Sequence, residues 1–178
     1  MEFILKTLKN IISKILVVEI KVFIDTQLWI FALKIPEEKD FNNKQEYENS
    51  FKNYEVANNF LKAKLHSDEI HMTYLQLGEI FHALGFRGKK LPLNYVQEYC
   101  SQLLSGEYMH WYDINYKTIK KALEISTLSK IHVWDYLCVL PFHKDIEIIF
   151  SCDKHFTHDS FKSLGPSVEN PIKDWFLL

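Results

Sequence analysis

Four acidic residues of this chain stand beside separate apolar segments, in positions from which their side chains can converge. They are Asp25 after residues 22–24, Asp153 after residues 148–150, Glu79 within residues 74–81 and Asp135 before residues 136–141. An acid that directly follows a buried strand lies at its carboxyl end, where open α/β sheets place their ligand sites. Carboxylates gathered away from water repel one another and lose hydration, so their charged forms need a cation. The pattern predicts a metal site.

The expected metal is Mg²⁺ or Mn²⁺, because a donor set made of carboxylate oxygens suits hard divalent cations. Taken singly, each acid has a simpler interpretation. Asp25, Asp135 and Asp153 are each suited to cap a helix, and Glu79 fits a solvated helix face. We favour the metal site because all four acids occur in the same chain, each beside an apolar segment that can position it.

Strands and helices are expected to alternate along the chain. Apolar runs predict strands at residues 18–24, 69–72, 109–114 and 146–151, and helical spacing predicts helices at 27–34, 51–65, 74–86, 92–104 and 115–129, with another opening at Asp135. Residues 37–50 are read as a loop or as an extension of the next helix. Such alternation predicts an α/β fold with a central parallel sheet in three α/β/α layers.

One domain is expected over residues 18–165, followed by a tail at 166–178. Residues 1–17 predict an additional amphipathic helix, whose apolar stripe is Ile4, Leu5, Leu8, Ile11, Ile12, Ile15 and Leu16. Lysines interrupt it too often for a membrane span, and no cleavage site of a signal peptide follows. We expect it to pack on the domain or on a second subunit, in preference to anchoring on a membrane surface.

Composition narrows the function classes. A formal net charge of −2 gives no general field for nucleic acid, so any phosphate contact must come from a local patch. Three cysteines without a CxxC spacing argue against a disulfide framework and favour a cytoplasmic protein. The chain has no GxxxxGK[ST] or GxGxxG phosphate loop, no GxSxG nucleophile motif and no HExxH zinc motif.

The acids and their flanking residues resemble the motifs of the PIN domain, a nuclease fold that includes the toxin half of VapBC toxin–antitoxin pairs. The resemblance covers about residues 18–161. The four motifs read VFIDTQLWI at residues 22–30, LQLGEI at 75–80, WDYL at 134–137 and IIFSCDKHF at 148–156. Gln27 stands where Asn is commonest in the family, and bulky Tyr136 follows the third acid where the family more often has a small residue. The fourth motif is the most specific.

The resemblance implies a metal-dependent endoribonuclease that hydrolyses RNA phosphodiester bonds. Asp25, Glu79, Asp135 and Asp153 would hold one or two ions, while the hydroxyls of Thr26 and Ser151 would orient these carboxylates. It further implies the toxin of a toxin–antitoxin pair, with an antitoxin partner and a homodimer as possible assemblies. The alternative is an inactive PIN-like module that binds RNA or protein, its site closed by Trp134 and Tyr136.

Clusters of basic residues and a group of histidines with a cysteine give weaker signals. Arg87, Lys89 and Lys90 form the densest basic cluster and follow the helix of Glu79, so they are candidates to bind the RNA backbone, although such charges usually form a solvated face. Lys117, Lys120 and Lys121 form another cluster. His155 and His158 with Cys152 invite a zinc interpretation, which we disfavour because no second clustered pair of ligands accompanies them.

Overall fold

A five-stranded, entirely parallel sheet forms the centre of the molecule, with the strand order β3-β2-β1-β4-β5. The computed structural model describes residues 19–177. The strands are β1 (Lys21–Ile24), β2 (Glu69–Thr73), β3 (Met109–Tyr112), β4 (Ile148–Phe150) and β5 (Ser167–Glu169). The expected helix at residues 1–17 lies outside the described residues.

Successive strands run outward from β1 in both directions, through β2 and β3 on one side and through β4 and β5 on the other. The order of the strands therefore reverses between β1 and β4. In parallel sheets the loops beyond the carboxyl ends diverge at such a point, which leaves room for a ligand. Asp25 follows β1 and Asp153 follows β4 by a few residues, so both lie beside this point.

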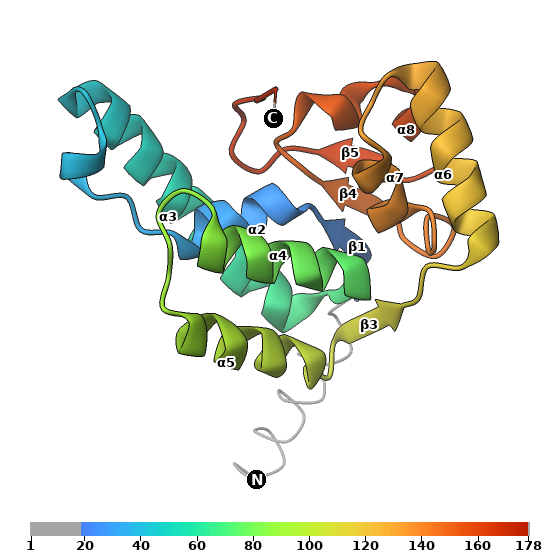
Figure 1. Ribbon diagram of the computed structural model, residues 1–178, viewed down its shortest axis with the longest axis horizontal. Coiled ribbons are helices and arrows are strands. Elements are labelled where there is room, and N and C mark those ends of the chain that lie inside the picture. The colour runs from blue at the N-terminus through green and yellow to red at the C-terminus, as the bar shows by residue number, and fades with distance from the viewer. Residues whose placement is uncertain (1–18, 178) are drawn as a thin grey trace, which may run out of the picture.

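Helices cover both faces of the sheet, as Figure 1 shows. They are α2 (Thr26–Leu33), α3 (Lys44–Ser67), α4 (Tyr74–Phe86), α5 (Leu93–Leu104), α6 (Tyr116–Ser129), α7 (Val133–Val139) and α8 (Asp159–Lys162), with short 3-10 turns η1 (Glu38–Asp40) and η2 (Lys154–Thr157). Buried residues of α2 to α5 pack with Val22, Ile24 and Ile70, whereas those of α6 to α8 pack with Phe23 and Ile149. Because side chains alternate along a strand, β1 contributes to both cores. The predicted three-layer α/β/α fold is confirmed.

Several element boundaries differ from the sequence expectations. Helix α3 begins at Lys44, so part of residues 37–50 is the extension of this helix that was one of the two expectations. Asn43 caps it by accepting from the backbone N–H of Glu46 at 2.9 Å. Helix α7 begins at Val133, which places Asp135 inside its first turn rather than at its opening. Residues 166–178, expected to be a tail, supply β5 at the edge of the sheet.

Cys100, Cys138 and Cys152 are all buried and free. Within residues 19–177, no helix combines the length and the hydrophobicity that crossing a bilayer requires.

Candidate active site

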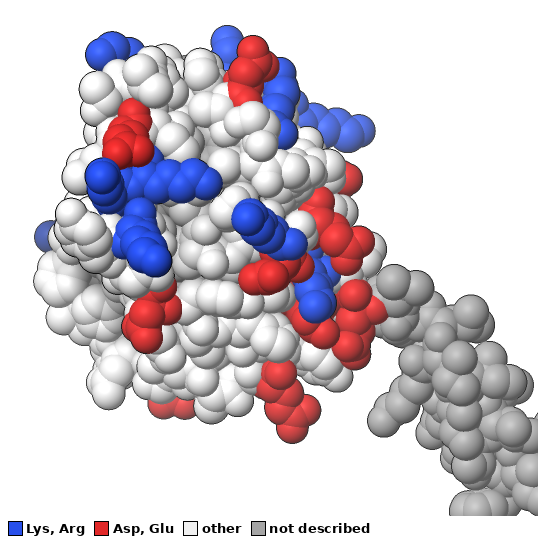
Figure 2. All heavy atoms as spheres, turned by 90° about the vertical axis from the view of Figure 1, so that its right-hand side faces the viewer, with Lys and Arg blue, Asp and Glu red and all other residues white. Residues whose placement is uncertain are grey.

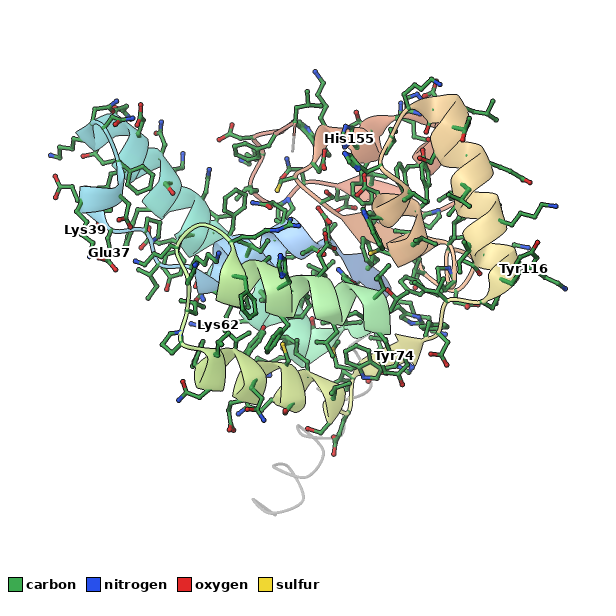
Figure 3. All side chains as sticks on the ribbon, in the orientation of Figure 1. Glu37, Lys39, Lys62, Tyr74, Tyr116 and His155 are labelled. Carbon is green, nitrogen blue, oxygen red and sulfur yellow. The ribbon has the colours of Figure 1, made fainter. Side chains whose placement is uncertain are left out.

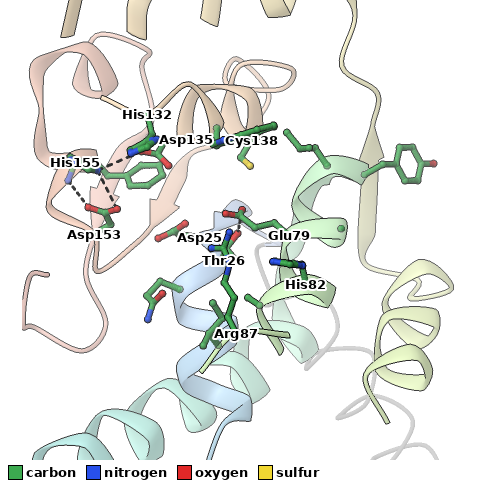
Figure 4. A pocket seen from close by; sticks show the side chains of 18 residues that line it. Asp25, Thr26, Glu79, His82, Arg87, His132, Asp135, Cys138, Asp153 and His155 are labelled. Carbon is green, nitrogen blue, oxygen red and sulfur yellow. Dashed lines mark hydrogen bonds and ion pairs between the residues drawn. The ribbon is translucent and has the colours of Figure 1, made fainter. Parts of the chain in front are cut away.

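A cavity of about 700 Å³ opens at the carboxyl edge of the sheet, between α2, α4, α7 and the segment that follows β4. Its walls include all four acids that the sequence analysis selected: Asp25, Glu79, Asp135 and Asp153. Figure 4 shows these side chains directed toward a common space from four different elements. The fold therefore brings together residues that are far apart in the sequence.

Ser151 links two of the acids. Its hydroxyl donates to Asp25 Oδ2 at 2.8 Å and accepts from the backbone N–H of Asp153 at 2.9 Å. The backbone N–H of Asp25 also donates to the carbonyl of Phe150 at 2.9 Å, which continues the pairing of β1 with β4. Asp25 and Asp153 are thus fixed relative to each other by the sheet and by the buried hydroxyl of Ser151.

The chain that leads away from Asp153 is held from its other side by the C-terminal segment. The backbone of Phe176 donates to the carbonyl of Cys152 at 2.8 Å and accepts from the N–H of Lys154 at 2.7 Å. These two bonds bracket Asp153 in a parallel bridge. The conformation of the loop that carries this acid therefore depends on residues near the end of the chain.

Thr26 and Glu79 form the second pair. The Thr26 hydroxyl donates to Glu79 Oε2 at 2.8 Å. Helix α4, which carries Glu79, is positioned from within the core, because the buried Gln76 side chain donates to the carbonyl of Ile24 at 2.7 Å. The hydroxyl of Thr73 caps the same helix by accepting from the backbone N–H of Gln76.

Asp135 is the least satisfied acid of the cavity. Its Oδ2 atom is buried and has no hydrogen-bond partner among the residues that the structure describes. The nearest cationic candidate is the His155 ring, whose Nδ1 lies 3.6 Å from Asp135 Oδ2 and 3.4 Å from Asp153 Oδ2. His155 was not among the site residues expected from the sequence, where the available signal was its position two residues after Asp153. In the structure, the backbone N–H of His155 donates to Asp153 Oδ1 in a tight turn.

Burial and mutual repulsion raise the pKa values of two acids. The pKa of Asp25 rises to about 7, chiefly through loss of hydration and then through the charges of Asp153 and Glu79, although the hydrogen bond from Ser151 opposes the rise. The pKa of Asp135 rises to about 8 for the same first reason, reinforced by the neighbouring acids. Burial beside these acids also raises the pKa of the Cys138 thiol.

This cavity fits a divalent cation. It combines several carboxylates, an unpartnered buried oxygen on Asp135 and two acids whose charged forms are disfavoured without a counter-charge. A cation would relieve each of these features. Oxygen donors predominate, which suits Mg²⁺ or Mn²⁺, and Asp135, Asp153 and His155 lie close enough to share one ion.

The basic cluster after α4 divides in two. Arg87 lines the cavity, whereas Lys90 is exposed and is not one of its lining residues. Lys89 pairs with Glu37 and donates to the carbonyl of Ile35 at 2.8 Å. Figure 3 shows Glu37 beside η1, well away from His155 at the cavity. Of these three basic residues, Arg87 is therefore the one placed to contact a molecule bound in the cavity of the four acids.

The second basic cluster lies on α6, at the right of Figure 1. Figure 2 views the molecule from that side and shows basic, acidic and uncharged surface interspersed rather than one continuous basic field. This agrees with the balanced net charge of the chain.

Neither bulky neighbour of Asp135 fills the cavity. Tyr136 is fully buried, stacks on Phe161 with ring centroids 4.6 Å apart and hydrogen-bonds the hydroxyls of Ser129 and Ser160. Trp134 is about half exposed and forms part of the cavity wall. The closure that the inactive-module hypothesis requires of Tyr136 is absent in the described part of the chain.

Comparison with known proteins gives the fold independent support. The chain is similar to a chain of VapBC2 from Rickettsia felis, crystallised with a DNA fragment from its promoter, at 15% sequence identity and a TM-score of 0.50. The match covers 85% of this chain and 98% of the other. No family model matches the sequence, and no curated relative was found. The likeness thus concerns the fold.

Proposed function

We propose that this protein is a ribonuclease of the PIN type, which hydrolyses RNA phosphodiester bonds with Mg²⁺ or Mn²⁺. The observation that carries the proposal is the convergence of Asp25, Glu79, Asp135 and Asp153 on one cavity, where the pKa values of Asp25 and Asp135 are raised. Burying such a set is unfavourable unless a cation or protonation offsets the charges, and carboxylates with strongly raised pKa values cluster at functional sites. The similarity to VapBC2 in fold and the PIN-like motifs of the sequence support the same assignment.

The four acids would hold the metal, with Thr26 and Ser151 fixing the orientation of Glu79 and Asp25 through hydrogen bonds of 2.8 Å each. A divalent cation in such a site supplies Lewis acidity toward a phosphate oxygen and promotes ionisation of water. The protein's own contribution is to keep the carboxylates in a fixed arrangement. It also places Asp25 in a partly buried position, where loss of hydration raises its pKa.

Arg87 and His155 complete the proposed site from opposite sides. Arg87 is exposed at the cavity wall, where its guanidinium can bind a phosphate of the RNA backbone. His155 lies between Asp135 and Asp153, so a protonated imidazole there would offset part of their charge before substrate arrives. Half-exposed Trp134 offers an aromatic face on which an unstacked base can pack.

The biological setting belongs to the same proposal. VapBC pairs consist of a toxin and an antitoxin, and we propose that this chain is the toxin of such a pair and acts in the cytoplasm. A protein antitoxin would then cover or distort the cavity. A homodimer is a further possibility that co-purification and light scattering address directly.

The test is cleavage of a mixed pool of structured RNAs by the purified protein with Mn²⁺, Mg²⁺ or EDTA. We expect cutting that requires the metal and falls by about 10³-fold or more in an Asp25→Asn/Asp153→Asn variant. Glu124→Gln serves as the matched control, because Glu124 is an exposed acid on the outer side of α6. Its activity should equal that of the wild type.

The ends of the products provide a second criterion. Hydrolysis by water leaves no 2′,3′-cyclic phosphate, whereas attack by the ribose 2′-hydroxyl with a histidine base produces one. Cyclic ends that persist in EDTA would assign the chemistry to a histidine such as His155 and overturn the metal mechanism. Absence of any cleavage, with Mn²⁺ binding retained, would favour the inactive RNA-binding or protein-binding module.

A further inference from the structure

A second group of metal-binding side chains lies at the opposite end of the sheet from the acidic cavity. Glu69 is the first residue of β2 and His71 its middle one, and His110 is opposite His71 in the register of β3. All three side chains can offer ligand atoms within 4.8 Å of one another. None of these residues lines the acidic cavity.

The His71 ring is the centre of this group and has one unused nitrogen. The residue is 3% exposed, and its Nε2 atom is buried without a hydrogen-bond partner in the described part of the chain. The other ring nitrogen, Nδ1, lies 2.9 Å from the Tyr112 hydroxyl. A bond at Nδ1 fixes the ring and leaves Nε2 to face its neighbours, which is how proteins orient metal-binding histidines. A buried orphan nitrogen of this kind needs an explanation.

Two possible ligands surround that nitrogen. Glu69 Oε2 lies 3.8 Å from His71 Nε2 and 3.5 Å from His110 Nε2. These separations are too long for good hydrogen bonds, yet they approach the spacing of two ligands on one ion, which is about 3.3 Å for bonds of 2.0–2.1 Å in a tetrahedron. The side chains of Glu69 and His110 are both partly exposed, so small rotations of the two can close these differences.

The packing around this group holds the His71 ring in place and keeps it neutral. The imidazole rings of His71 and His110 stack with centroids 4.9 Å apart, and Phe142 covers His71 from the loop after α7. Burial and the neighbouring His110 lower the pKa of His71 to about 4, so its ring is neutral and able to bind a metal. The negative charges of Glu69 and Asp145 act against this lowering, whereas the charge of Lys21, whose Nζ lies 3.9 Å from Glu69 Oε2, acts with it.

We propose that Glu69, His71 and His110 form a second metal site, specific for Zn²⁺ or a similar borderline transition metal and distinct from the acidic cavity. Two imidazoles and one carboxylate form a ligand set that binds such transition metals more strongly than it binds hard cations. The site would join β2 to the edge strand β3 and leave one coordination position for water. It does not depend on the proposed nuclease activity.

The test is titration of the metal-free full chain with Co²⁺, followed by competition with Zn²⁺. Four-coordinate Co²⁺ absorbs strongly in the visible range, whereas Co²⁺ surrounded by oxygen ligands absorbs weakly. We expect about one equivalent of strongly absorbing Co²⁺, displaced by Zn²⁺, in the wild type and equally in the Asp25→Asn/Asp153→Asn variant. Zn²⁺ should also raise the thermal midpoint of both proteins.

Two variants probe the ligands. His110→Ala removes a partly exposed ligand, and Glu69→Gln removes the carboxylate charge while preserving shape; each should weaken binding by at least about tenfold. His158→Ala is the matched control, because it removes an exposed imidazole that follows β4 and is not one of the proposed ligands. This variant should bind Co²⁺ like the wild type. Circular dichroism verifies that each variant is folded. Unchanged binding in both ligand variants, or binding lost only in the cavity variant, would overturn the proposal.

Discussion

The two ends of the central sheet gather ionisable side chains in different ways. At the carboxyl end, four acids from β1, α4, α7 and the segment after β4 surround a cavity of about 700 Å³, and several of their oxygens already accept hydrogen bonds. At the amino end, one acid and two histidines from neighbouring strands meet in a closely packed cluster, and none of the three lines that cavity. The first arrangement has room for a substrate, and the second has room for an ion.

The difference follows from the topology. Loops diverge at the carboxyl end because the strand order reverses between β1 and β4, whereas β2 and β3 are adjacent strands whose side chains pair in register. We therefore expect hard cations and RNA at the first site and a transition metal at the second. Variants at each end test whether the two proposed sites act independently.

The largest expected effect is the loss of RNA cleavage without loss of the second site. In the Asp25→Asn/Asp153→Asn variant, Mn²⁺-dependent cleavage should fall by about 10³-fold or more while Co²⁺ absorption stays unchanged. Single-turnover cleavage and visible absorption, measured on the same preparation, give both values. A parallel loss of the two signals would show that the two ends act as one unit.

The next effect concerns pH and belongs to the acidic end. The raised native pKa values of Asp25 and Asp135 mean that the native state keeps protons that the unfolded state has already released above about pH 4. The free energy of unfolding of the metal-free protein should therefore fall as the pH rises from about 5 to 8, by an amount on the order of several kcal/mol.

Urea denaturation in EDTA at several pH values measures this slope. An Asp25→Asn/Asp135→Asn variant should show a markedly flatter slope, and Mn²⁺ should stabilise the wild type most at pH 8. An equally steep slope in the variant would place the titrating groups elsewhere in the molecule.

A smaller effect is expected for the hydroxyls that orient the acids. Thr26→Val keeps the shape of the side chain but removes the donor to Glu79, and Ser151→Ala removes the donor to Asp25. Each should lower kcat by about 10- to 100-fold with little change in KM. Thr26→Ser, which retains the donor, should restore most of the activity. Failure of this rescue would point to packing rather than to orientation as the role of Thr26.

The smallest effect belongs to the amino end. Lys21→Gln removes the ammonium group 3.9 Å from Glu69 Oε2 and should strengthen Zn²⁺ binding by a few-fold, since the pair is partly exposed and therefore weak. Competition with a chromophoric chelator measures the change. Weaker binding in this variant would mean that Lys21 positions Glu69 instead of competing with the metal.

The sequence predicted the carboxyl end better than the amino end, for a physical reason. Asp25 and Asp153 each follow an apolar strand, and α4 runs over the predicted residues 74–86 because the sequence provides a helix cap at Thr73. These signals are local. Each acid could therefore be placed from its own neighbours, although their use in catalysis stays a prediction.

The remaining features depend on contacts between distant segments. His71 and His110 meet only through the register of β2 with β3, which no local pattern encodes. β5 has the sequence Ser-Val-Glu, whose short and mostly polar character gives no strand signal, and it forms because β4 offers a free edge. Likewise, no local pattern indicated His155, because its side chain approaches Asp135, on another helix, only in the folded structure.

The hydrogen bonds between Phe176 and the residues on both sides of Asp153 have a practical consequence for handling the protein. A tag or fusion partner attached after Leu178, or proteolytic trimming of the last few residues, would disturb the loop that carries Asp153, a proposed metal ligand, while leaving the five strands intact. A chain shortened after Asp174 should fold but bind Mn²⁺ more weakly, which calorimetry can measure. Trimming at this end is thus a candidate means of control that requires no change inside the cavity.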